Sequence, residues 1–246
     1  MSRYINAMMN EAGAEILSSV RAPEFIIPTI VFPVGFYSLF GVMLNSGGST
    51  GTYLLATYGV FAVLGPAIFG FGASIAAERE KGWLDLKRAV PLSGVSYVLA
   101  KLLVTLVFSA ISLALLYAAA GFMGGVAMEK SVWLSLLGVH LLGAIPFALI
   151  GITIGFLLSG NGAVAVANVV FLLLSALGGL WLPIFLFPDF MQAFAHTLPS
   201  FHMGEISLSI VGAPGDHNPQ QSALIMIGMT GLFLLFAVLA WRRQAQ

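Results

Sequence analysis

The 246-residue chain has no cysteine, so disulfide bonds, thiolate metal sites and cysteine nucleophiles are all excluded. It also has few charges: 8% of its residues are charged, whereas a soluble domain has roughly a quarter. Ten Lys plus Arg balance ten Asp plus Glu, so the net charge gives no reason to expect nucleic acid or another polyanion as a partner. Together these shortages exclude an ordinary water-soluble fold.

Two sequence patterns are also missing. No Gly-x-x-x-x-Gly-Lys-Ser/Thr phosphate loop occurs, so this chain cannot bind ATP in that way. The first 22 residues contain no continuous apolar run followed by a small-residue cleavage site, so we expect no removable signal peptide. Any energy from ATP must therefore come through another polypeptide.

The chain is instead rich in long apolar runs, with 59% hydrophobic residues. A helix needs about 20 such residues to cross a hydrocarbon core of about 30 Å. We therefore predict an all-α integral membrane fold, a single domain over residues 1–246. Pro23, Pro28 and Pro33 indicate that the first span is not a straight helix. The six predicted spans cover about residues 24–44, 53–77, 97–124, 131–158, 163–186 and 222–241.

The positions of the basic residues predict how the chain is oriented, because Lys and Arg are retained on the cytoplasmic side. With both termini in the cytoplasm, only Lys130 lies outside. The opposite orientation would reverse that distribution. The nine basic residues then inside are Arg3, Arg21, Arg79, Lys81, Lys87, Arg88, Lys101, Arg242 and Arg243.

Residues 1–22 have the spacing of an amphipathic helix. Such a helix lies in the membrane interface with its apolar face in the acyl boundary, and it could serve as an anchor or relay motion. Its apolar face comprises Tyr4, Ile5, Met8, Met9, Ala12, Ile16, Leu17 and Val20, and its polar face Asn6, Asn10, Glu11, Glu15 and Ser18.

A second unusual segment, residues 187–221, separates the last two spans and is longer than a typical loop. It is too apolar for a solvated loop, so we predict an external hairpin of short helices that dips back toward the membrane. Residues 212–219 hold Pro, Gly, Asp and Asn and predict an exposed turn.

The densest charge follows the second span, in the cytoplasmic loop at residues 78–95. Gly82 permits a bend at the membrane exit, and Pro91 disfavours helix just before it. Residues 83–90 could form two helical turns, with Trp83 and Leu84 interleaved among the charges. The loop is therefore either a solvated connection or a short amphipathic helix that docks a cytoplasmic partner.

The run AAEREKGWLDLKRAVPLSG resembles the cytoplasmic loop of the ABC-2 type exporter permeases. The order of elements along the whole chain is also similar to that family. Two departures leave the substrate subgroup open: Trp83 replaces a small polar residue, and Leu198-Pro199-Ser200 stands where the family often has Asn-Pro. The matching loop positions are Lys81, Gly82, Leu84, Pro91 and Ser93.

This resemblance implies a permease subunit in the inner (cytoplasmic) membrane. It would pair with a second copy or a paralogue and with a separate ABC ATPase subunit, which would bind ATP and Mg; this chain itself would bind no cofactor and would not be an enzyme. The loop would couple the two subunits through Glu78, Arg79, Glu80, Lys81, Gly82, Trp83, Leu84, Asp85, Leu86, Lys87, Arg88 and Pro91.

Polar residues within the apolar regions are candidates for the translocation path, because unpaired polar groups are costly in hydrocarbon. His140 and Asn168 stand out in the fourth and fifth spans, and Glu205 could face the outer vestibule. Each could instead bond a neighbouring helix. A metal site of His196, His202 and Glu205 is disfavoured, because no His-Glu-x-x-His is present and Pro199 interrupts the spacing.

Apolar and aromatic spans favour an amphiphilic substrate, such as a lipid, a lipopeptide or a hydrophobic drug, and glycan export stays open. The alternatives are a self-contained channel or carrier and an intramembrane enzyme, for example a hydrolase using Ser159. Neither is favoured, because the spans offer His140 but no carboxylate near the midplane.

Overall fold

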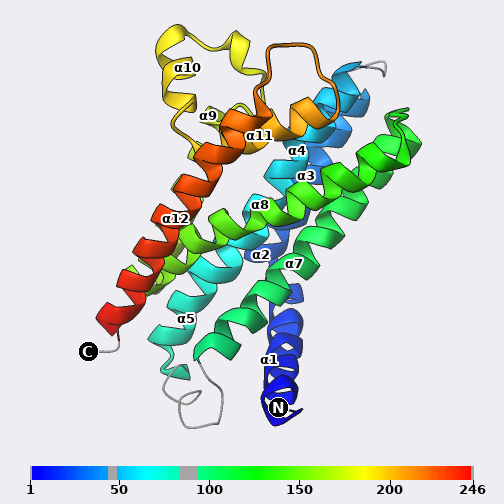
Figure 1. Ribbon diagram of the computed structural model, residues 1–246. Helices are drawn as coiled ribbons and strands as arrows, with labels where there is room; N and C mark the ends of the chain where they lie inside the picture. Colours follow the sequence, from blue (N-terminus) through cyan, green and yellow to red (C-terminus); the bar gives the residue numbers. More distant parts are fainter. Residues whose placement is uncertain (1, 44–48, 84–93, 245–246) are drawn as a thin grey trace.

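The computed structural model describes residues 2–43, 49–83 and 94–244, and within them the protein is all-helical. Five helices are long and apolar enough to cross a membrane: Ser49–Glu80, Ser96–Met123, Lys130–Leu157, Gly160–Leu177 and Pro219–Arg243. A shorter apolar helix covers Ile27–Met43. Figure 1 shows these helices as one elongated bundle, with both ends of the chain at the same end of it.

Most of the elements are α-helices, with short π-helical segments η1 to η4 and one 3-10 turn, η5. In chain order they are α1 (Ser2–Val20), α2 (Pro23–Ile26), η1 (Ile27–Val31), α3 (Phe32–Tyr37), η2 (Ser38–Met43), α4 (Ser49–Ile68), η3 (Phe69–Ala73), α5 (Ser74–Glu80), α7 (Gly94–Ala118), η4 (Ala119–Met123), α8 (Lys130–Leu157), α9 (Gly160–Leu177), η5 (Ile184–Leu186), α10 (Asp189–Ala195), α11 (Pro199–Ile210) and α12 (Pro219–Gln244).

The first apolar segment alternates between α- and π-helical turns. Pro28 lies in the first turn of η1 and Pro33 in the first turn of α3. Proline lacks the backbone donor that a regular α-helix requires, and a local π turn accommodates that loss. The irregular first segment predicted from its prolines is therefore present.

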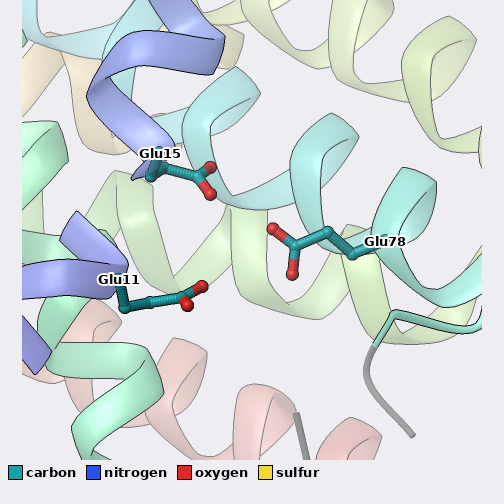
Figure 2. A group of neighbouring side chains, drawn as sticks. All are labelled: Glu11, Glu15 and Glu78. Carbon is teal, nitrogen blue, oxygen red and sulfur yellow. The ribbon is translucent and has the colours of Figure 1, made fainter. Parts of the chain in front are cut away.

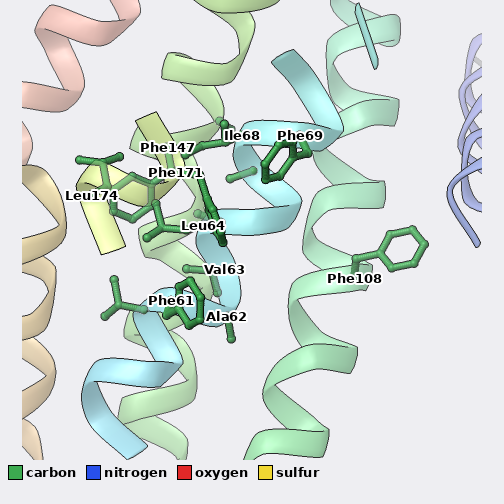
Figure 3. Packing of buried hydrophobic residues seen from close by; sticks show 14 of the residues in the cluster. Phe61, Ala62, Val63, Leu64, Ile68, Phe69, Phe108, Phe147, Phe171 and Leu174 are labelled. Carbon is green, nitrogen blue, oxygen red and sulfur yellow. The ribbon is translucent and has the colours of Figure 1, made fainter. Parts of the chain in front are cut away.

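Helix α4 forms the centre of the bundle. Every residue from 54 to 68 is buried, which fits a helix that is apolar all round. Phe61 stacks on Phe171 of α9 with ring centroids 5.3 Å apart, and Phe147 of α8 is fully buried beside them (Figure 3). Helix α12 lies at the periphery of the bundle. Only 17% of its most apolar stretch is buried, against 78% for the corresponding stretch of the Ser49–Glu80 helix.

Glycines allow α8 to approach the central helix closely. A Cβ at Gly151 would lie 2.6 Å from the carbonyl oxygen of Ala67, and one at Gly155 would lie 3.0 Å from that of Gly72. The first distance is shorter than real Cβ contacts and the second is at their limit, so both glycines let the two helix backbones lie close together. Small residues four apart typically permit such packing between membrane helices.

The fifth predicted span is too long, because α9 ends at Leu177 and not near residue 186. Gly178 packs so tightly against the Ser200 hydroxyl that no side chain would fit, and Gly179 has a φ of +75°. Both features end the helix. Residues 178–186, predicted as span, therefore form a turn and η5. They precede α10 and α11, which lie at the end of the bundle opposite the termini (Figure 1).

Candidate coupling site at the base of the charged loop

The second apolar helix continues through η3 and α5 as a single 32-residue unit and ends at Glu80. The Gly82 amide donates to the Arg79 carbonyl at 3.0 Å, and Gly82 has a φ of +69°, a left-handed conformation that glycine adopts without strain. Trp83 follows, with 51% of its surface exposed and its ring centroid 5.6 Å from Lys81 Nζ. The predicted bend thus has the backbone conformation that only glycine takes readily.

Most of the predicted docking helix at residues 83–90 lies outside the described residues. These residues are Leu84, Asp85, Leu86, Lys87 and Arg88, together with the following Pro91.

Glu78, two residues before the helix end, takes part in a buried charge network. Lys101 Nζ of α7 donates to Glu78 Oε1 at 2.9 Å and to Glu15 Oε1 of α1 at 2.7 Å. It also lies 2.6 Å from the Ser74 hydroxyl. Tyr97 donates from its hydroxyl to Glu78 Oε2 at 2.8 Å. This network, defined by Glu15, Ser74, Glu78, Tyr97 and Lys101, joins α1, α5 and α7.

The network contains more acid than base. The carboxylates of Glu11, Glu15 and Glu78 converge, with oxygens within 4.8 Å of one another (Figure 2). Three carboxylates at this spacing could hold a metal ion, but the Lys101 ammonium already binds two of them and is only 2% exposed. Buried carboxylates are costly unless they are paired. Lys101 therefore supplies the cation that allows these acids to lie inside the protein.

The next residue, Arg79, caps the C-terminal end of α8. Its Nη1 donates to the carbonyl oxygens of Gly155, Phe156 and Leu158 at 2.8, 3.0 and 3.1 Å. The last carbonyls of a helix have no partner within the helix, and they form the negative end of its dipole. The Arg79 guanidinium group supplies both the hydrogen-bond donors that these carbonyls lack and a positive charge at the negative end of the dipole.

Glu80, the last residue of α5, lies against the start of α9. Its carboxylate packs directly against Gly160, the first residue of α9, so closely that any side chain at position 160 would overlap it. A negative charge is favourable at a helix N-terminus. Consecutive residues of α5 thus bind the end of α8 and the beginning of α9.

The three residues predicted for a translocation path have different surroundings. His140 is fully buried: its Nε2 donates to the Ala56 carbonyl at 3.0 Å, and its Nδ1 lies 2.9 Å from the Tyr117 hydroxyl. Asn168 is exposed on α9 and donates to the Val164 carbonyl at 2.9 Å. Glu205 lies 3.0 Å from Nδ1 of His217. His140, Asn168 and Glu205 therefore each have a polar partner within the protein.

His202 also has partners within the protein. Its Nε2 donates to the His196 carbonyl at 2.9 Å, and its Nδ1 lies 3.3 Å from the Ser222 hydroxyl. Burial lowers the pKa of His202, which favours the neutral imidazole. Both ring nitrogens are therefore engaged in hydrogen bonds, and Glu205 is paired elsewhere.

A helical bundle, a charged loop after its central helix and a loop base bound to the bundle together agree with one family of membrane proteins. The family model described as ABC-2 type transporter matches residues 12–211. The chain belongs to this family. It is a membrane transport subunit of the ABC-2 type, without an ATPase site of its own.

One relative of this ABC-2 subunit covers nearly its full length. The protein named "Putative transport permease YvfS" from Bacillus subtilis (strain 168) is 27% identical over 245 residues, which are 98% of this chain and 99% of that protein. The similarity therefore includes the N-terminal helix, the charged loop and the last helix.

The charge network of this ABC-2 subunit was not predicted from the sequence. The sequence places Lys101 among the cytoplasmic charges and Glu11 and Glu15 on the polar face of an interfacial helix. In the structure Glu11 and Glu15 are partly buried against the bundle, whereas Asn6, Asn10 and Ser18 of the same face are exposed. Met9, Leu17 and Val20 of the apolar face are each more than half exposed. One signal was available: Glu11 and Glu15 are one turn apart, and Lys101 lies one turn after Tyr97 in an apolar run.

Proposed function

We propose that this chain is the permease subunit of an ATP-driven exporter that moves an amphiphile across the cytoplasmic membrane. The amphiphile would be a lipid, a lipopeptide or a hydrophobic drug. The observation that carries the proposal is the loop base, where Glu78, Arg79 and Glu80 contact three other helices, α7, α8 and α9, and Gly82 has the left-handed conformation just after the helix end. A loop held in this way can transmit a push from a cytoplasmic partner into the bundle.

The proposal includes six spans with both termini in the cytoplasm. Five of these spans are the long helices, and the remaining one, the first in the chain, is the segment from α2 through η2. In it, Ile27–Met43 continues from Pro23–Ile26. Those residues are enough to cross a hydrocarbon core of about 30 Å. Arg79, Arg242 and Arg243 lie at the ends of α5 and α12, on the side of the bundle that holds both termini, in agreement with positive residues inside.

The partner that supplies energy is a separate ABC ATPase. Trp83 and Lys81 are exposed beyond the helix end and offer an aromatic and cationic surface for docking. Aromatic residues are enriched at protein interfaces because they bury a large area with few rotatable bonds. In this proposal, ATP and Mg are bound by the ATPase, and closure of the ATPase displaces the loop.

A second permease copy would pack on α9. Its outward face is apolar, and Asn168 lies among these residues. Pairing there would place Asn168 between two protomers, where a translocation path would run. The exposed apolar residues of this face are Val164, Val166, Val169, Leu172 and Leu173.

Because the chain has no cysteine, a single introduced cysteine tests this interface. Val169→Cys is expected to give a disulfide-linked dimer in membranes under mild oxidation, since a two-fold axis near α9 brings the two copies of residue 169 together. Ile227→Cys on α12, which is 70% exposed, is the matched control and should stay monomeric. Linkage from Ile227 alone would place the interface on α12, and linkage from neither would favour pairing with a paralogue.

The substrate class is tested with the complex of permease and ATPase in lipid vesicles. We expect ATP-dependent movement of a fluorescent phospholipid or a hydrophobic dye, and none when the ATPase is omitted. A lipid-linked glycan precursor serves as the competing probe. Exclusive movement of the glycan precursor would rule out the amphiphile, and movement without the ATPase would favour a self-contained carrier.

A further inference from the structure

Three consecutive residues at the loop base point in three directions. Glu78 binds Lys101 and Tyr97 of α7, Arg79 binds the end of α8, and Glu80 packs on the start of α9. A helix places successive side chains about 100° apart, which is how adjacent residues reach different neighbours. One short stretch of chain therefore contacts α7, α8 and α9.

The first set of contacts leads to α7 and α1. Lys101 binds Glu78 and Glu15 with the same ammonium group, which joins α1 to the loop base through α7. The Ser74 hydroxyl of α5 also donates directly to Glu15 Oε1 at 2.6 Å. The side chains of these two carboxylates are only 9% and 12% exposed, and an ion pair in such surroundings is screened far less than one at the surface.

The second set leads to the turn between α8 and α9. Arg79 binds three carbonyl oxygens at the end of α8, and Glu80 lies against Gly160 directly after that turn. The turn is short, because α8 ends at Leu157 and α9 begins at Gly160. A movement of α5 must therefore either carry this turn along or break several charge-assisted hydrogen bonds.

We propose that Glu78, Arg79 and Glu80 are positioning residues that divide a displacement of the cytoplasmic loop between two separate pairs of helices. Glu78 conveys it to α7 and α1, and Arg79 with Glu80 conveys it to α8 and α9. Docking of the ATPase is assigned instead to residues beyond the helix end, such as Trp83, although Glu80 is itself exposed. The inference rests on the proposed function, because it requires an ATPase that moves the loop.

Each of the two pairs of helices would then have a different part in transport. Helix α9 carries the exposed face on which a second copy would pack, so the second set of contacts would drive the two permeases relative to each other. Helix α1 has its exposed apolar residues on the side away from the network, so the first set would move a helix that contacts lipid. Separate contacts allow one response to be removed while the other is kept.

The test is hydrogen–deuterium exchange on the complex of permease and ATPase in nanodiscs, with and without ATP plus vanadate. In the wild type, both α1 and residues 155–163 should change their exchange when nucleotide is trapped. Arg79→Gln should lose the change at residues 155–163 and keep it in α1. Glu15→Gln, which removes a charge and keeps the side-chain shape, should show the reverse.

Controls separate this inference from simpler explanations. Arg243→Ala removes an exposed arginine at the end of α12 and should leave both responses intact. Gly160→Ala should displace Glu80 and reproduce the loss at residues 155–163, which provides a second variant if Arg79→Gln does not fold. Each variant must still hold the ATPase in the wild-type ratio.

The outcomes are distinct. Loss of ATPase binding in Arg79→Gln would show that Arg79 docks the partner and would overturn the inference. So would equal losses at both regions in either variant, unchanged responses in both variants, or a wild-type complex that shows no response to nucleotide. A wild-type permease that binds no ATPase at all would instead contradict the proposed function itself.

Discussion

Replacement of Lys101 by methionine is expected to destabilise the protein strongly. The ammonium group binds Glu15 and Glu78 at 2.7 and 2.9 Å, and it is 2% exposed. Removing one partner of a buried ion pair leaves an uncompensated charge and costs about 3–5 kcal/mol. We expect a clear fall in the midpoint temperature of unfolding in detergent, measured by the fraction that still elutes as a folded species after heating.

A compensating variant distinguishes lost charge balance from lost packing. Lys101→Met combined with Glu15→Gln and Glu78→Gln removes the cation and both of its acidic partners. This triple variant should recover most of the lost stability, because the ammonium group and both carboxylates that it binds lose their charges together. If the single variant is as stable as the wild type, or the triple variant is no better than the single one, the network does not have the role described here.

Gly59→Ala is expected to be the second severe substitution. A Cβ at position 59 would overlap the imidazole of His140 on α8. That ring cannot easily move away, because it is fully buried and bonded to Ala56 and Tyr117. Overpacking of this kind costs about 1–3 kcal/mol, and each lost hydrogen bond adds about 1 kcal/mol.

Two matched variants make this prediction specific. Gly138→Ala, on α8, meets nothing within 4 Å and should leave the midpoint temperature close to that of the wild type. Gly59→Ala combined with His140→Ala removes the overlap and should be more stable than Gly59→Ala alone. Additive losses in the double variant would show that the two positions do not interact.

The fold was largely predictable because lipid imposes simple requirements on a chain. Runs of about 20 apolar residues must be helical in a membrane, so the positions of the long helices followed from where the apolar runs lie along the chain. The irregular first segment followed from Pro28 and Pro33. The end of α9 did not, because hydropathy continues past Leu177, and the helix ends through Gly178, Gly179 and the packing of Ser200.

The candidate site was only partly predictable. Charge density located the loop, and the lone Gly82 located the bend. The directions in which Glu78, Arg79 and Glu80 point depend on which helices surround α5, and one sequence does not specify those neighbours. The sequence grouped all three with the residues that would couple the permease to its ATPase. The structure adds that each of them contacts the protein's own helices.

Lys101 illustrates the same limit more sharply. A lysine near the end of an apolar run usually extends to the membrane surface, and the positive-inside rule counts it there. Its burial depends on Glu15, which lies in a different helix and is distant in the sequence. Only a tertiary arrangement shows that these two residues meet.

The most direct test is affinity purification of this chain from its native membrane in mild detergent, followed by identification of what accompanies it. We predict stoichiometric recovery of a subunit with a phosphate-loop ATPase sequence, lost in Trp83→Asp and kept in the control Arg243→Ala. Recovery of the folded permease without any ATPase would contradict the account and would favour a self-contained channel, carrier or enzyme.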